Sequence, residues 1–177
     1  IRRLPFYRSL LEGKYLPRLR RVGYVMNYSI FRQLTAEEIA ELYANDYRQL
    51  TRFEFFKLYR SETNPQKREK MLRQALEVYP SFLAAANDLS SMLIDRQVYE
   101  PTLLRPFVGS KAPQVVNINQ LITLLNSGLY TEADSVAAFI EDNEDSRLLL
   151  AVNGVLNGRY AENFTTVAKT GIRNELI

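Results

Sequence analysis

Two different periods of hydrophobic positions divide the chain near residue 34. Between residues 21 and 31 apolar or aromatic side chains alternate with others, so that one face of the segment carries Val22, Tyr24, Met26, Tyr28 and Ile30. A period of two with Val, Ile and Tyr is typical of a β-strand. From residue 35 onward apolar positions recur every three or four residues, which predicts helices. The sequence therefore predicts one long strand followed by a helical region.

The predicted strand has no neighbour of its own kind. A short helix from Leu4 to Leu11 precedes it, and no second segment with a period of two follows it. Because a strand needs hydrogen-bonding partners, we expect Val22 to Phe31 to pair outside the helical region. The partner would be a domain upstream of Ile1, or the same strand of a second copy in a strand-mediated homodimer.

Start and stop signals place the helices of the second region. Two segments have the Thr-x-x-Glu spacing of a capping box, in which Thr and Glu satisfy free N–H groups of the first turn; they are Thr35 with Glu38 and Thr51 with Glu54. Proline and asparagine mark further ends. The later predicted helices span residues 65–79, 82–95, 101–108, 113–126, 131–141, 146–156 and 161–170.

Short motifs recur at a nearly constant interval along this helical region. A turn followed by Tyr appears as Gln97-Val-Tyr99, Gly128-Leu-Tyr130 and Gly158-Arg-Tyr160, at intervals of 31 and 30 residues. An asparagine on the preceding helix recurs as Asn87, Asn119 and Asn153, at intervals of 32 and 34 residues. Periods of this length with two helices each are typical of stacked helical hairpins.

These motifs resemble the tetratricopeptide repeat family. The matching positions are Phe56, Tyr59, Ala75 and Pro80 in the first unit, Gly128, Tyr130 and Ala133 in a later one, and Gly158 with Tyr160 in the last. The departures are Asn163 in place of Ala, Pro101 and Pro106 within an expected helix, and short final units. The resemblance implies a mainly α fold, a tetratricopeptide-like α-α superhelix of antiparallel hairpins over residues 35–177, preceded by the short helix and the long strand.

A narrower resemblance extends over the N-terminal segment. Leu16-Pro-Arg-Leu-Arg20, the strand, the helix start at Thr35 and the terminal Asn174-Glu-Leu176 look like the C-terminal part of Bacteroidetes envelope proteins that join an OmpA-like domain to tetratricopeptide repeats. This implies that residues 1–34 are the remnant of such a domain. It also implies a periplasmic or outer-membrane-associated address, with membrane association only through other parts of the full-length protein; a cytoplasmic regulator with the same repeats is the alternative.

Composition removes much catalytic chemistry. The 177 residues include no His and no Cys, which excludes His- or Cys-based nucleophile pairs and the commonest transition-metal ligands. No cofactor is implied. Residues 1–33 hold eight basic residues and one acidic residue, a net charge of +7, whereas the other 15 basic and 19 acidic residues give −4. Because apolar residues are threaded through the basic segment at structural spacing, we interpret it as a charged helix and strand and expect no nucleic-acid partner.

Carboxylates keep one catalytic alternative open. Acidic residues gather at Glu132, Asp134, Glu141, Asp142, Glu144 and Asp145. They could supply the acid and base of a glycosidase-like hydrolase on an α-helical scaffold, or oxygen ligands for a hard cation. The spacing lacks the alternating order of a calcium loop, so we interpret the group as a solvated helix end and predict no metal site.

The remaining candidates point to a binding surface. Asn87, Asn119 and Asn153 would lie on first helices, and their amides could pair with an extended peptide or tie one hairpin to the next. Lys57 and Arg60, one turn apart, could hold a carboxylate or belong to a solvated face. The sequence therefore predicts a non-catalytic protein-protein interaction module whose groove contains these five residues, with a carboxylate-based hydrolase as the alternative.

Overall fold

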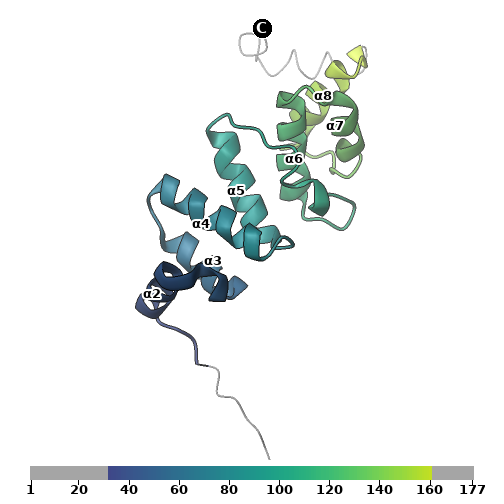
Figure 1. Cartoon of the computed structure of the whole chain (residues 1–177). Coiled ribbons are helices and arrows are strands. Elements are labelled where there is room, and N and C mark those ends of the chain that lie inside the picture. Colours follow the sequence, from purple (N-terminus) through teal and green to yellow (C-terminus); the bar gives the residue numbers. More distant parts are fainter. Residues whose placement is uncertain (1–31, 161–177) are drawn as a thin grey trace, which may run out of the picture. The chain divides into compact units, whose positions relative to one another are not determined.

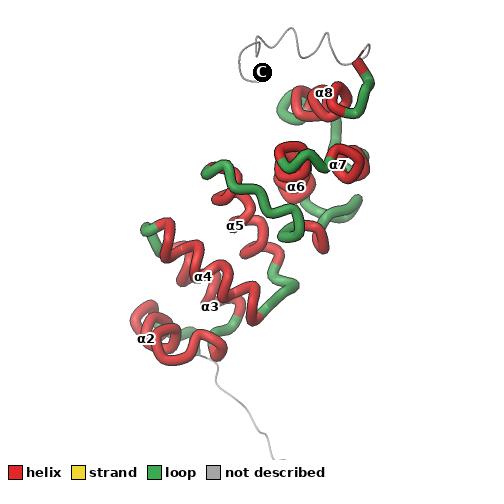
Figure 2. Tube along the Cα trace, turned by 45° about the horizontal axis from the view of Figure 1, so that its top comes forward, coloured by secondary structure: helices red, strands yellow, loops and turns green. Residues whose placement is uncertain are grey.

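The computed structural model describes residues 32–160, and its residues from Leu34 onward belong to one compact unit (Figure 1). This part of the chain is mainly helical and contains no β-strand (Figure 2), which confirms the predicted fold class at that level. The helices predicted over 4–11 and 161–170 and the strand from Val22 to Phe31 lie outside the described residues. The α-helices are α2 (Ala36–Asp46), α3 (Arg52–Ser61), α4 (Pro65–Val78), α5 (Leu83–Asp95), α6 (Gln114–Asn126), α7 (Tyr130–Ala137) and α8 (Arg147–Leu156), with the 3-10 helices η2 (Tyr47–Gln49) and η3 (Arg105–Phe107).

Both predicted capping boxes begin helices. In α3 the Thr51 hydroxyl accepts from the backbone N–H of Glu54, and the Thr51 backbone N–H donates to the Glu54 carboxylate at 2.7 Å. Thr35 and Glu38 make the same reciprocal pair at the start of α2. Such a cap contributes about 1 kcal/mol because it satisfies N–H groups that have no partner within the helix.

The helices α5, α6 and α8 end in the same left-handed cap. Together with α3 we call them the first helices, because each begins a repeat unit of the sequence. Gln97, Gly128 and Gly158 have φ angles of 57°, 72° and 83°, and each follows the last turn of α5, α6 or α8. The next residue in each case donates its N–H to the carbonyl five positions earlier, in the pairs Val98–Leu93, Leu129–Leu124 and Arg159–Gly154 at 2.8–2.9 Å. The three turns predicted to be equivalent therefore share one backbone geometry.

The helices pack mainly in chain order. The most extensive contacts join α3 with α4, α4 with α5, α5 with α6, α6 with α7, and α7 with α8. Buried apolar residues form one core beneath α2 to α5, a second beneath α6 to α8, and a small cluster of Ala86, Leu104 and Val116 that includes residues of α5 and α6. Each fully buried Leu or Phe contributes about 1.5–3 kcal/mol relative to an exposed one. The result is a series of helices in which each mainly packs against its neighbours along the chain.

The prediction of a helix over residues 101–108 is wrong. A turn spans residues 101–104, and only the 3-10 helix η3 follows. Pro101 and Pro106 have no N–H to donate to an α-helical ladder. The side chain of Gln120 also captures the Pro101 carbonyl at 2.9 Å, which holds this segment in an irregular conformation.

The helix predicted over residues 131–141 is shorter than expected. α7 ends at Ala137, and the chain then tightens into i to i−3 bonds, from Phe139 N to Val136 O and from Ile140 N to Ala137 O. Gln114 of α6 explains the stop, because its amide binds the Phe139 carbonyl at 3.1 Å and the Glu141 N–H at 3.2 Å. A tertiary contact therefore occupies groups that a longer helix would need.

Candidate functional site

Lys57 and Arg60 lie on an aromatic face of α3. The Lys57 ammonium is 4.7 Å from the centre of the Phe53 ring, and the Arg60 guanidinium carbon is 5.3 Å from the centre of the Phe56 ring. Each cation is one turn beyond its ring, as expected for i and i+4 positions of a helix. Phe53 is 52% exposed, so this face presents both apolar surface and positive charge. We call Phe53, Lys57 and Arg60 the α3 patch.

Asn87 and Asn119 form a pair between consecutive first helices. The Asn119 amide nitrogen, on α6, donates to the Asn87 amide oxygen, on α5, at 3.0 Å. Both side chains are partly buried. The structure thus brings together two of the three predicted asparagines and makes them partners of each other, which is the tie between hairpins that the sequence left open. We call them the amide pair.

The third predicted asparagine has a different environment. Asn153 on α8 is only 2% exposed and donates to Asp134 on α7 at 2.9 Å. Arg159 also binds the Asp134 carboxylate, and these two bonds, Arg159 first, lower the pKa of Asp134 below its ordinary value. Asn153 and its neighbours line a depression of about 380 Å³ between α7 and α8. Its observed contacts are those of an internal tie.

Three members of the predicted acidic group form ion pairs, each with a different arginine. Glu132 binds Arg105 at 2.6 Å, Asp134 binds Arg159, and Asp142 binds Arg147 at 3.2 Å. Within residues 32–160 no group of three His, Cys, Asp or Glu side chains is placed to hold a metal ion. Glu132 and Asp134 also form ion pairs with residues 25–27 positions away, and their side chains are 49% and 39% exposed, so both remain at the solvated surface. These pairs join consecutive hairpins.

A set of amides on α6 was missed by the sequence reasoning. Asn117 is fully buried, and its amide accepts from Gly109 N and donates to Gly109 O, both at 3.1 Å. Gln114 holds the backbone of Phe139 and Glu141, as described above, and Gln120 holds Pro101. The signal in the sequence was available, since α6 has amides at three-residue spacing and no charged residue among its 13 positions. This helix binds irregular backbone through its side chains.

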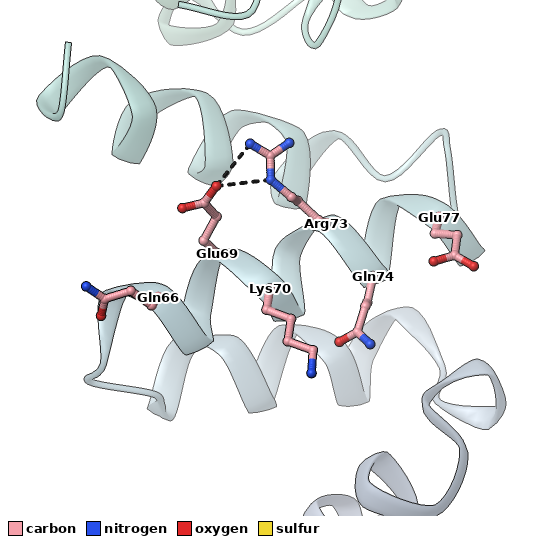
Figure 3. Close-up of a pocket in the computed structure, with 6 residues that line it drawn as sticks. All are labelled: Gln66, Glu69, Lys70, Arg73, Gln74 and Glu77. Carbon is pink, nitrogen blue, oxygen red and sulfur yellow. Dashed lines mark hydrogen bonds and ion pairs between the residues drawn. The ribbon is translucent and has the colours of Figure 1, made fainter. Parts of the chain in front are cut away.

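A second depression, of about 350 Å³, runs along α4 (Figure 3). Glu69 and Arg73 lie towards one side of the helix, where they bind each other and also Arg96 and Glu100. Gln74 lies towards the other side and accepts from the Tyr43 hydroxyl. The pKa of Glu69 is lowered, above all by the hydrogen bond from Arg96. Most of the polar groups here already join α4 to its neighbours, so we assign this depression a structural role. Its lining residues are Gln66, Glu69, Lys70, Arg73, Gln74 and Glu77.

Tyr59 is a buried polar group beneath the α3 patch. Its side chain is fully buried, and its hydroxyl has no hydrogen-bond partner within the described residues. Burial, and next the negative charge of Asp88 on α5, raise the pKa of Tyr59 to about 12. The ring packs edge-on against Phe56 with centroids 5.5 Å apart. Tyr59 therefore stays neutral and fixes the aromatic face on which Arg60 rests.

No family model, no curated protein and no solved structure matches the chain. None of the helices that the structure describes is both long and apolar enough to cross a membrane.

Proposed function

We propose that the chain is a non-catalytic protein-protein interaction module built as a tetratricopeptide-like superhelix. The observation that carries the proposal is the set of three identical caps at intervals of 31 and 30 residues, combined with helix packing in chain order. Stacked hairpins of this kind place their first helices side by side and so build one extended surface. Such surfaces suit polypeptide partners because they offer many weak contacts over a long distance.

The binding surface in this proposal is formed by the first helices. The α3 patch supplies an exposed ring and two cations, and the amide pair supplies hydrogen-bonding groups between α5 and α6. The exposed ring and the two cations give this part of α3 both apolar and charged contacts to offer a partner. Asn153, which is buried against Asp134, belongs to the proposal as a support for α7 and α8 and contacts the partner least.

The proposed cellular address follows from the resemblance to Bacteroidetes envelope proteins. In that proposal residues 1–34 are the last part of an OmpA-like domain, and the helical region works in the periplasm or at the outer membrane. A cytoplasmic regulator with the same repeats would use the same surface. Binding in either compartment relies on the same α3 patch and amide pair.

The carboxylate hydrolase, the alternative function, gains no support from the described acids. A general acid needs a carboxyl group whose pKa is raised. The pKa values of Glu69, Glu77 and Asp134 are all lowered by hydrogen bonds from neighbouring side chains. These shifts favour permanently ionised, structural carboxylates, so we prefer the binding function.

Site-specific photocrosslinking to a peptide library tests the binding function. The full chain would carry a photoreactive phenylalanine in place of Phe53 on α3, and a matched variant would carry it in place of the exposed Lys70 on α4. A displayed library of random peptides would be offered to both. We expect peptides to be enriched and crosslinked through position 53 and not through position 70. Failure to enrich any peptide, or crosslinks from position 70 alone, would refute the proposed function.

A further inference from the structure

Two Asn-Gly dipeptides lie four residues apart at the end of α8. They are Asn153-Gly154 and Asn157-Gly158, and no other asparagine of the sequence is followed by glycine. In such a dipeptide the backbone nitrogen of glycine can attack the side-chain carbonyl carbon of asparagine, because glycine has no side chain that hinders the approach. Both dipeptides therefore have the sequence of a deamidation site, and the fold decides which of them can react.

The first dipeptide is held inside the helix. Asn153 is 2% exposed, Gly154 is also buried, and both belong to α8. The attack requires the backbone to rotate out of the helical conformation, which would break helix hydrogen bonds and expose buried surface. We therefore expect the fold to protect Asn153.

The second dipeptide lies at the exposed end of the same helix. Asn157 is the C-cap residue, Gly158 is exposed, and a Cβ atom added at Gly158 would have no neighbouring atom within 4 Å. The Gly158 N–H donates to the Val155 carbonyl at 3.0 Å, so the attacking nitrogen is released when this last turn opens. The end of a helix opens at a lower cost in free energy than its middle. The structure thus directs the reaction to Asn157.

The Asn157 amide also has a structural role. Its nitrogen donates to the Asn153 backbone carbonyl at 2.9 Å and to the Asn153 side-chain oxygen at 3.1 Å. The Asn153 amide in turn donates to Asp134 of α7, and Arg159 binds the same carboxylate. Asn157 therefore supports, through Asn153, the polar link between α7 and α8.

We propose that Asn157 is a site of spontaneous deamidation, and that its modification loosens the end of α8 from α7. The Gly158 nitrogen forms a bond to the side-chain carbonyl carbon of Asn157. The side-chain nitrogen leaves as ammonia, together with the proton that the Gly158 nitrogen gives up. Water then opens the resulting succinimide ring to aspartate or isoaspartate.

Both products weaken the link between the two helices. A carboxylate at position 157 cannot donate to the two Asn153 oxygens, so the side-chain oxygen of the buried Asn153 loses this donor. The new negative charge also lies at the C-terminal end of α8, where the helix dipole disfavours it. Isoaspartate in addition lengthens the backbone by a methylene group, which displaces Arg159 from Asp134. This effect is independent of what the surface formed by the first helices binds.

Ageing of the full chain tests the site. The chain would be kept at body temperature in mildly alkaline buffer, digested with pepsin in acid, and analysed by mass spectrometry for the amide-to-acid mass change. We expect Asn157 to react at least about tenfold faster than Asn153, because opening at Asn153 must break further hydrogen bonds. In a parallel sample unfolded in guanidinium chloride the two asparagines should react at similar rates. Equal rates in the folded chain, or an Asn157 that reacts only in the unfolded chain, would overturn the inference.

Two substitutions separate the modification from its consequence. Asn157→Ser has a model within the chain, because Ser127, at the equivalent position after α6, donates its hydroxyl to the Thr123 carbonyl at 2.8 Å. This variant should fold and show no mass change at position 157 on ageing. Asn157→Asp imitates the aspartate product. It should lower the melting temperature by roughly 2–8 °C and speed hydrogen exchange in α7 and at the end of α8.

Asn126→Asp is the matched control for the added charge. Asn126 also lies at a helix end and donates to a carbonyl four residues earlier, that of Ile122, but this bond stays within α6. Hydrogen exchange at the end of α8 should therefore be unchanged in this variant. Exchange in α7 and α8 that stays unchanged in Asn157→Asp, or that rises equally in Asn126→Asp, would overturn the proposed loosening.

Discussion

Opposite stability changes are expected at two equivalent turns. Gln97 and Gly128 occupy the same left-handed cap, after α5 and α6 respectively, yet one is a residue with a side chain and the other a glycine. The left-handed conformation costs a residue with a Cβ atom roughly 1–2 kcal/mol. Gln97→Gly removes that cost, and Gly128→Ala introduces it. No neighbouring atom lies within 4 Å of a Cβ added at Gly128, so the change there is conformational and not a clash.

The net effect also includes the unfolded chain. Glycine loses about 0.4–1 kcal/mol more conformational entropy than alanine on folding, which opposes both changes. We therefore expect Gln97→Gly to raise the free energy of unfolding by about 0.5–1 kcal/mol, and Gly128→Ala to lower it by about 1 kcal/mol. For a chain of this size, a change of about 1 kcal/mol in the free energy of unfolding shifts the melting temperature by roughly 2–4 °C.

Circular dichroism at the helix band during thermal unfolding measures these shifts, and it suits a chain without Trp. Gln97→Ala is the matched control, because it removes the same exposed side chain but retains a Cβ atom in the left-handed conformation. Its melting temperature should stay close to that of the parent chain. A lower melting temperature for Gln97→Gly, or no change for Gly128→Ala, would refute the claim that the two turns share one geometry.

Three further predictions concern caps, ion pairs and the core. Thr51→Ala removes the capping box of α3 and should destabilise the chain by about 1 kcal/mol in urea titrations; no loss would mean that the box is not formed in solution. The lowered pKa values of Glu69 and Asp134 mean that these groups contribute stability above their unfolded pKa, and this contribution is lost as pH falls below about 4.5. The difference between the melting temperatures at pH 7 and pH 3 should therefore be smaller in a variant with Glu69→Gln and Asp134→Asn, and an unchanged difference would contradict the pairing. Leu124→Ala, at a side chain that is 1% exposed in the second core, should cost about 2–5 kcal/mol, whereas a cost below 1 kcal/mol would place Leu124 outside that core.

The features that the sequence predicted correctly are those that depend on residues close by in the chain. The capping boxes at Thr35 and Thr51 and the turns at Gly128 and Gly158 are determined by interactions within a few residues, so their signals are local. The helix periods are local in the same sense. For this reason most helix boundaries were predicted to within one residue, including α5 and α6.

Features that depend on distant residues were not predicted. α7 ends early because Gln114, about 25 residues upstream, binds the backbone beyond it. The segment after Tyr99 is irregular because its prolines coincide with a backbone capture by Gln120. Local patterns carry no information about which distant amide will meet which carbonyl, so these ends could not be derived from periodicity.

The candidate site shows the same division. Spacing identified Asn87 and Asn119 as equivalent residues, but their bond to each other depends on how α5 and α6 pack. Spacing also grouped Asn153 with them, although its partner is Asp134 on α7. Lys57 and Arg60 were placed correctly on one helix, while their stacking on aromatic rings required the side-chain geometry.

Methyl resonances would test the central claim, which is that a polypeptide binds on the first helices. The full chain would be labelled at Ile and Val methyl groups and titrated with a peptide enriched from the displayed library. The account predicts shifts at Val115 and Ile118, on the face of the amide pair, and none at Val98, which is 40% exposed at a hairpin turn, or at the buried Val136 of α7. Shifts confined to Val98 or Val136, with Val115 and Ile118 unmoved, would contradict it.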